Sequence, residues 1–140
     1  MKTYRLFANR LLELLGDATA LRISCEGFMP LSIERIGTDA EGREMIAMSH
    51  TGEQSGDLMR DPEIVFTLYQ WPDGMAAEPI SFRNDYLGVM QEVYIYDDHG
   101  NRTHVKASLK SELKSFSVMW FRNLKAQGFF SPNAKRERLA

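Results

Sequence analysis

The spacing of hydrophobic residues changes twice along this chain, and this change limits the folds that the chain can adopt. Large apolar residues recur every three or four positions over residues 4–15 and again over residues 108–127, which predicts an amphipathic helix near each end. Gly16 and Gly128 follow the two stretches as C-terminal stops. Ser108 is the expected N-cap of the second helix.

Between the helices the period falls to two, and turn signals such as residues 38–42 and 71–74 separate short strand-like stretches. One long stretch, residues 86–96, contains Gly88 as an expected bend, and the phase of strand 43–50 is ambiguous because both of its faces are apolar. No helix separates consecutive strands, so neighbours should pair antiparallel. The sequence predicts an α+β fold, with an antiparallel meander sheet of about 5–6 strands and N- and C-terminal helices packed on one face.

Length and composition limit the class of protein. The 140 residues fit a single α+β domain over residues 1–130 and a flexible C-terminal tail over residues 131–140. The lone cysteine, Cys25, is expected to be a reduced core thiol. No stretch approaches the ~20 apolar residues of a membrane span, and charges interrupt the N-terminus too often for a signal peptide. We therefore expect a cytoplasmic protein without a membrane partner.

Charge and motifs narrow the function further. The formal net charge of -2 removes a general attraction to nucleic acid, so no nucleic-acid partner is expected. The basic residues 135–138 are the local exception, and they support only a weaker hypothesis, an accessory protein that contacts nucleic acid through this tail. The chain lacks the glycine-rich dinucleotide and phosphate loops, the serine nucleophile elbow, the zincin histidine pair and the cysteines of a zinc finger. No cofactor is expected.

The densest polar stretch is residues 52–63, directly before an apolar strand predicted at residues 63–69. Gly56 and Pro62 restrict the backbone at either end. The stretch is therefore interpreted as a defined loop that carries charge.

The carboxylates of this loop have two interpretations. As ligands they would form a divalent-metal or acid–base site composed of His50, Asp57, Asp61, Glu63 and Glu92. As structural groups, Asp57 would cap a turn and Asp61 would form an Asx-turn before the following proline. The spacing does not match a calcium loop, which favours the structural interpretation.

Alternation separates the two faces of the predicted strands. If Ile64 and Phe66 point toward the helices, then Glu63 and Tyr69 point away from them, and the same parity places Glu92 outward. A face that combines tyrosines and carboxylates suits the binding of a protein partner. The predicted binding residues are Gln54, Asp57, Asp61, Glu63, Tyr69, Gln91, Glu92 and Tyr94.

Four aromatic residues near the C-terminus leave two alternatives. Trp120 and Phe121 are adjacent, so at helical spacing they should not both face one core. One of them, together with Phe129 and Phe130, would then form an exposed patch suited to a homodimer. Alternatively, Phe129 and Phe130 fold back onto the edge of the sheet.

Residues 55–63 read Ser-Gly-Asp-Leu-Met-Arg-Asp-Pro-Glu, residues 84–88 read Asn-Asp-Tyr-Leu-Gly, and residues 91–94 read Gln-Glu-Val-Tyr. With the Trp-Phe-x-x-Leu-x-x-x-Gly ending of the second helix, this pattern resembles a bacterial family known only as a domain of unknown function. The resemblance covers residues 50–128. It implies a setting on plasmids, phages and integrated elements, and it implies no activity.

The sequence therefore predicts a small non-catalytic binding or regulatory module of a bacterial mobile element, which engages a protein partner through the open sheet face and the 52–63 loop. The alternative is a divalent-metal-dependent, hydrolase-like enzyme that uses Asp57, Asp61, Glu63 and Glu92. Convergence of these carboxylates in space would distinguish the two functions.

Overall fold

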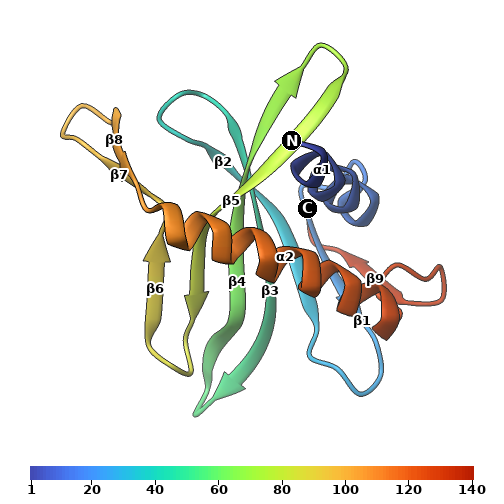
Figure 1. Cartoon of the computed structure of the whole chain (residues 1–140). Helices are drawn as coiled ribbons and strands as arrows, with labels where there is room; N and C mark the ends of the chain where they lie inside the picture. The colour runs from blue at the N-terminus through green and yellow to red at the C-terminus, as the bar shows by residue number, and fades with distance from the viewer.

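A computed structural model describes all 140 residues. The helices are α1 (Lys2–Leu15) and α2 (Ala107–Gln127). The strands are β1 (Ala20–Ser24), β2 (Leu31–Thr38), β3 (Glu44–Gln54), β4 (Asp57–Trp71), β5 (Gly74–Asn84), β6 (Val89–Glu92), β7 (Tyr94–Tyr96), β8 (Arg102–Val105) and β9 (Lys135–Arg138). Seven strands form one antiparallel sheet in the order β6-β5-β4-β3-β2-β1-β9, and β7 and β8 form a separate hairpin (Figure 1).

The α+β class and the terminal positions of both helices are confirmed, but the sheet is larger than the predicted five or six strands. Part of the difference lies at residues 135–138, where we expected a flexible tail. These residues form β9, which pairs with β1, and Leu139 continues the contact by donating its amide to the Ala20 carbonyl at 2.9 Å. The run of charged side chains concealed this strand because all four residues of β9 are exposed.

Both helices pack against the same face of the sheet. Phe66 of β4 is fully buried, and its ring lies 6.0 Å from that of Phe7 in α1 and 5.9 Å from that of Phe121 in α2. The neighbouring strand supplies Ile46 and Met48 to this core, which settles the phase of strand 43–50. The opposite face of the sheet, which we call the open face, carries the alternate residues.

The expectation that Trp120 and Phe121 cannot both be buried is wrong. The exposed fraction of Trp120 is 4 %, and that of Phe121 is 5 %. Helix α2 lies against both α1 and the sheet, so its buried arc is wider than a single stripe (Figure 1). Phe121 faces Phe7 and Phe66, whereas Trp120 faces Phe116 and His50. Phe129 is fully buried and folds back, which removes most of the patch considered for a homodimer.

The predicted loop at residues 52–63 is instead the end of a long hairpin formed by β3 and β4. Gln54 pairs with Asp57, and the two-residue turn between them places Ser55 at φ 53° and Gly56 at φ 86°, the positive angles that a tight type I′ turn requires. This end of the hairpin extends beyond the helices, so both of its faces meet solvent and its residues are polar. The polar composition of this hairpin end is therefore the reason why the sequence predicted a loop here.

The predicted long strand over residues 86–96 is divided into β6 and β7, and Gly88 belongs to the turn before β6 rather than to a bend within a strand. Leu87 is 73 % exposed, whereas Val93 between the two strands is fully buried. Helix α2 starts at Ala107 and its N-cap is Lys106, so Ser108 is not the cap. Gly128 does end α2 with a left-handed conformation.

Candidate binding groove on the open face

Cross-strand register aligns the open-face residues of neighbouring strands into rows. One row runs from β6 to β2 through Glu92, Ser81, Val65, Ala47 and Glu34, each residue directly opposite the next. The three central side chains are small, and a carboxylate stands at each end. A hollow lies at either end of this row, and we call the row with its two hollows the open-face groove.

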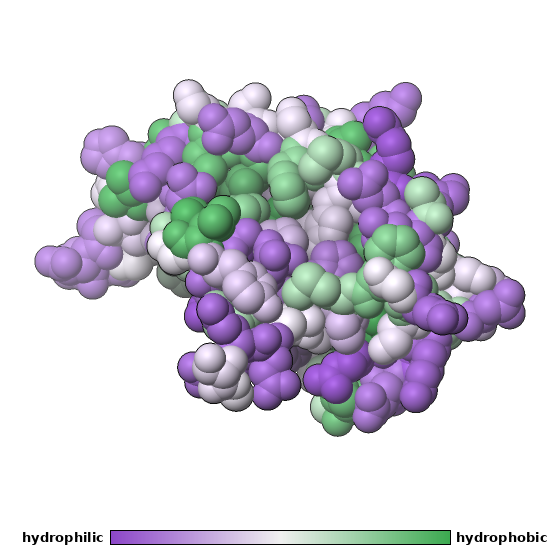
Figure 2. Space-filling model, turned by 90° about the horizontal axis from the view of Figure 1, so that it is seen from below, coloured by the Kyte–Doolittle hydropathy of each residue, from purple (hydrophilic) through white to green (hydrophobic).

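The open-face groove deepens at its β6 end into a pocket of about 350 Å³, which we call the β6 pocket. Most of its lining is apolar and consists of Ile36, Met45, Val65, Ile80 and Met90 with the rings of Tyr94 and Tyr96. Its charged lining residues are Asp39 and Glu92, and no basic residue lines it. Seen from below, hydrophobic surface lies mainly in the upper part of the view among polar side chains, and the outer left and the lower parts are mostly polar (Figure 2).

The β1 end of the open-face groove is a second hollow, of about 200 Å³, with a polar lining. Arg60 and Glu63 line it and form an ion pair at 3.0 Å from Nε to Oε2. Arg22 and Glu34 contribute further charges of opposite sign. This hollow is therefore suited to polar contacts, whereas the β6 pocket is suited to an apolar group.

A buried carboxylate ties the β7–β8 hairpin to the main sheet. Only 6 % of the Glu78 side chain is exposed, and it accepts hydrogen bonds from the hydroxyls of Tyr69 at 3.0 Å and Tyr94. Lys110 of α2 completes the cluster with an ion pair to Glu78 at 3.2 Å. Burial raises the pKa of the Tyr94 hydroxyl above its ordinary value, and the Glu78 carboxylate raises this pKa further. Tyr94 therefore stays protonated as a donor.

Arg102 of β8 extends this contact toward the turn between β2 and β3. Its guanidinium carbon lies 3.8 Å from the centre of the Tyr94 ring, and its Nη1 donates to the Tyr69 hydroxyl at 3.2 Å. Asp39 lies 3.9 Å from Arg102 and 3.5 Å from Arg43. The charges beside the β6 pocket thus compensate one another and fix the wall that Tyr94 forms.

The predicted binding residues lie in separate places. Gln54 and Asp57 are at the exposed tip of the β3–β4 hairpin, and Gln91 is exposed on β6. Tyr69 and Tyr94 are half-buried and engaged with Glu78 rather than free on the surface. The residues that line a hollow of the open-face groove are Glu63, Glu92 and Tyr94.

The predicted metal ligands are not brought together. The structure contains no group of three or more histidine, cysteine, aspartate or glutamate side chains that could hold a metal ion. Glu63 and Glu92 are on β4 and β6, with β5 between them, so their strands are roughly 10 Å apart. His50 packs against Trp120 and Phe129 in the core, with ring centres 5.6 and 5.5 Å apart.

Two of the motifs noted in the sequence contact each other in space. The side-chain amide of Asn84 donates to the Asp61 carboxylate at 2.6 Å. The backbone amide of Arg60 donates to the Asp85 carboxylate at 2.8 Å, and the backbone amide of Asp85 donates to the Arg60 carbonyl at 2.8 Å. The Arg60 amide is the main cause of the lowered pKa of Asp85, and Arg83 lowers this pKa further. These contacts tie the β5–β6 turn to the β3–β4 hairpin. The contact of Asp61 is with Asn84, so it differs from the Asx-turn that the structural interpretation predicted.

Gly52 shows how closely these two segments approach. A Cβ atom built at Gly52 would lie 2.5 Å from the Tyr86 hydroxyl oxygen and 2.9 Å from Met29 Cε. Any larger residue would therefore displace the ends of the Tyr86 and Met29 side chains. Gly52 thus allows the Tyr86 side chain to lie close to the β3–β4 hairpin and does not mark a flexible loop.

Burial of His50 gives the stability of the fold a dependence on pH. Desolvation lowers the pKa of His50, although its Nδ1 bonds to the Met29 carbonyl at 3.0 Å. The unfolded chain therefore binds more protons than the folded chain below about pH 6.5. The contribution of neutral His50 to the free energy of unfolding is fully present above that pH. This contribution is lost as the pH falls through the lower pKa of His50 in the folded chain.

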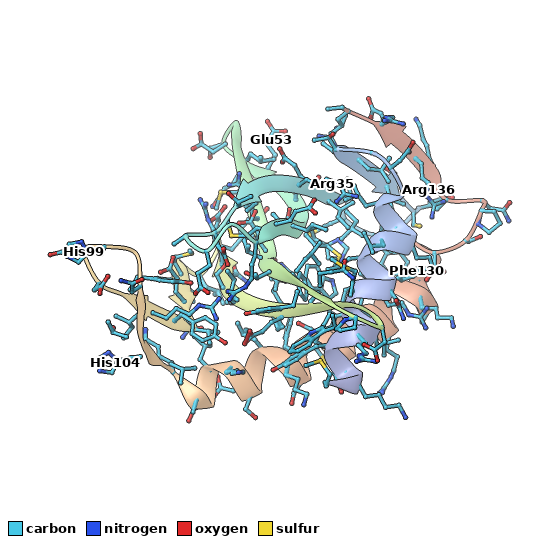
Figure 3. The ribbon with its side chains drawn as sticks, turned by 90° about the horizontal axis from the view of Figure 1, so that it is seen from above. Arg35, Glu53, His99, His104, Phe130 and Arg136 are labelled. Carbon is cyan, nitrogen blue, oxygen red and sulfur yellow. The ribbon has the colours of Figure 1, made fainter.

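We expect His50→Gln to reduce the difference between the free energies of unfolding at pH 7.5 and pH 5.5, measured by urea denaturation. His99→Gln, in the exposed β7–β8 turn, is the control and should keep the wild-type difference (Figure 3). A variant at His50 with the full wild-type pH dependence would contradict this assignment.

Sequence reasoning identified Glu92 and Tyr94 of the β6 pocket but missed Ile36, Met45 and Ser81. The alternation that points Ile64 and Phe66 toward the helices also places Val65, which lies between them, outward. Met45 had no such signal because both faces of its strand are apolar. Asp39 was seen only as a turn residue, and no local pattern linked it to Arg102, which is distant in the sequence.

Comparison with known proteins identifies the family of this chain. The family model described as Domain of unknown function (DUF6908) matches residues 4–130. The chain belongs to this family. No curated protein and no solved structure matches it. The DUF6908 match extends beyond the resemblance noted over residues 50–128 and includes both helices and most of the sheet.

The setting of this DUF6908 member on bacterial mobile elements stays a prediction. No helix of this protein is both long enough and apolar enough to cross a membrane.

Proposed function

We propose that the chain is a non-catalytic binding module that engages a protein partner through the open-face groove. The observation that carries this proposal is the β6 pocket, a largely apolar hollow of about 350 Å³ on the side of the sheet that no helix covers. Pockets that combine apolar walls with a few polar groups are the usual binding sites of proteins. A bacterial mobile element is the expected genomic setting of this function.

The surroundings of the β6 pocket favour contact with a macromolecule. Met90 is 58 % exposed, Ile36 41 % and Tyr96 37 %, so apolar surface continues from the pocket onto its rim. Exposed apolar area beside a concave site is typical of interaction surfaces. The polar hollow at the β1 end supplies the polar contacts that accompany such a core.

The chemistry beside the β6 pocket supports binding rather than catalysis. Glu78 is engaged by two tyrosine hydroxyls and Lys110, and Asp39 lies between two arginines. Groups that compensate one another in this way hold a wall in place, whereas a general acid or base must reach a substrate.

The proposal can be tested with a displayed library of random twelve-residue peptides, selected on the immobilised chain. We expect enriched peptides to bind the wild-type chain and to lose at least about tenfold in affinity for Met90→Lys, which places a charge at the rim of the β6 pocket. The matched control is Met119→Lys on α2, where the wild-type residue is 46 % exposed on the other side of the sheet. Affinity for this control should change less than about twofold.

Two results would overturn the proposal. One is the absence of any peptide that enriches above a selection on an unrelated immobilised protein. The other is equal loss of affinity in Met90→Lys and Met119→Lys. Thermal denaturation of both variants checks that neither substitution unfolds the chain, since exposed substitutions usually change stability by less than about 0.5 kcal/mol.

A further inference from the structure

The two edges of the main sheet differ in charge. Strand β9, at one edge, consists of Lys135–Arg138 with the sequence Lys-Arg-Glu-Arg, and all four residues are exposed. Strand β6, at the other edge, has the sequence Val-Met-Gln-Glu and carries a single charge (Figure 1). Every edge strand presents free backbone donors and acceptors, and charged side chains along it discourage pairing with another strand. Strand β6 is therefore the edge better suited to receive an added strand.

The β6 edge adjoins the β6 pocket. Met90 and Glu92 both line the pocket, and they lie on the same face of the strand because they are two residues apart. A residue of an added strand directly opposite either one would point to that same face. Alternate side chains of the added strand would therefore project toward the pocket.

The charges at the β6 pocket indicate which side chain it would accept. Asp39 is 6 % exposed at its side chain and lies beside Arg43 and Arg102, so its charge is largely compensated. Glu92 is exposed, and no ion pair engages it. Apart from Ser81, the remaining lining is apolar or aromatic. An apolar channel with one free carboxylate at its rim complements a long aliphatic side chain that ends in a cation.

We propose that the occupant of the β6 pocket is an extended segment of a protein partner that pairs with β6 as an additional strand and inserts a lysine or arginine side chain. The aliphatic stem contacts Met45, Val65 and Met90, and the cationic end pairs with Glu92. Backbone pairing supplies affinity, and the pocket supplies the selection of one side chain. This inference rests on the proposed function and specifies its partner.

The test uses synthetic eight-residue peptides derived from the sequences enriched by the library selection. We expect lysine or arginine at one fixed position of the enriched peptides. Replacing that residue with norleucine, which keeps the stem and removes the charge, should weaken binding about fivefold, the size expected of an exposed ion pair. The Glu92→Gln variant should bind the lysine and norleucine peptides equally.

Charge exchange provides the decisive comparison. The Glu92→Lys variant should disfavour the lysine peptide and should prefer a peptide with glutamate at the same position. Asp98→Lys, in the exposed turn between β7 and β8, is the matched control and should keep the lysine preference. Methylation of every second backbone amide of the peptide should abolish binding in one of the two possible phases only, because alternate amides of an added strand face β6.

The outcomes separate this inference from the function on which it rests. Enriched peptides that depend on Met90 but show no cation preference, or no response to Glu92→Lys, would overturn the inference and leave the proposed function intact. Equal effects of both methylation phases would overturn strand addition. Self-association of the chain that Met90→Lys abolishes, seen by analytical ultracentrifugation, would assign β6 to a second copy and would also overturn the inference. Failure to enrich any peptide would overturn both proposals.

Discussion

Replacing Phe66 by alanine is expected to lower the free energy of unfolding by ~3 to 5 kcal/mol, the cost of removing a large aromatic side chain from a closed core. Phe66 is fully buried, and its ring contacts Phe7 of α1 and Phe121 of α2. The cavity would therefore lie at the one place where the sheet and both helices meet.

Urea denaturation followed by tryptophan fluorescence would measure this loss. Met119→Ala on the exposed side of α2 is the control, and it should change the free energy of unfolding by less than about 0.5 kcal/mol. A Phe66→Ala variant that unfolds at the same urea concentration as the wild type would contradict the packing of both helices on this face.

The second large effect is expected at Glu78. Replacing Glu78 by alanine leaves the hydroxyls of Tyr69 and Tyr94 without their acceptor and Lys110 without its partner. Loss of hydrogen bonds to a buried charged group should cost about 3 kcal/mol in total. These bonds tie the β7–β8 hairpin to β5. We therefore also expect the substitution to speed the exchange of the backbone amides of residues 102–105 with solvent, and to do so more than for the amides of the main sheet.

A double-mutant cycle with Tyr94→Phe would separate the contact from unrelated effects. The two substitutions should be less than additive, since each removes the same hydrogen bond. Glu53→Ala at the solvent-exposed tip of the β3–β4 hairpin is the control and should leave stability and exchange unchanged (Figure 3). Strict additivity, or unaltered exchange in the hairpin, would show that Glu78 does not hold β7 and β8.

The β6 pocket illustrates why only part of the candidate site was accessible to prediction. Alternation along one strand indicates which residues share a face, and this was sufficient for Val65 and Glu92. It does not indicate which strands are neighbours. Ile36 and Asp39 reach the pocket only because the end of β2 and the turn after it lie near the β7–β8 hairpin, an arrangement without a local signature.

The polar stretch at residues 52–63 illustrates the opposite error. Its glycines and carboxylates were interpreted as a charged loop, yet the chain there is a paired hairpin with a two-residue turn. A polar composition indicates that a segment is exposed to solvent. The end of this hairpin extends beyond the helices and is exposed on both faces. Local polarity therefore could not distinguish a loop from a doubly solvated pair of strands.

The sequence alone determined the features that depend on short-range periodicity and backbone preference. These are the two terminal helices, the stop of α2 at Gly128, the Pro72–Asp73 turn and the antiparallel pairing of consecutive strands. Tertiary structure alone decided the seventh strand at β9, the burial of both Trp120 and Phe121, and the meeting of Arg102 with Asp39. Each of these depends on a partner far away in the chain, because exposure and charge compensation are properties of neighbours in space.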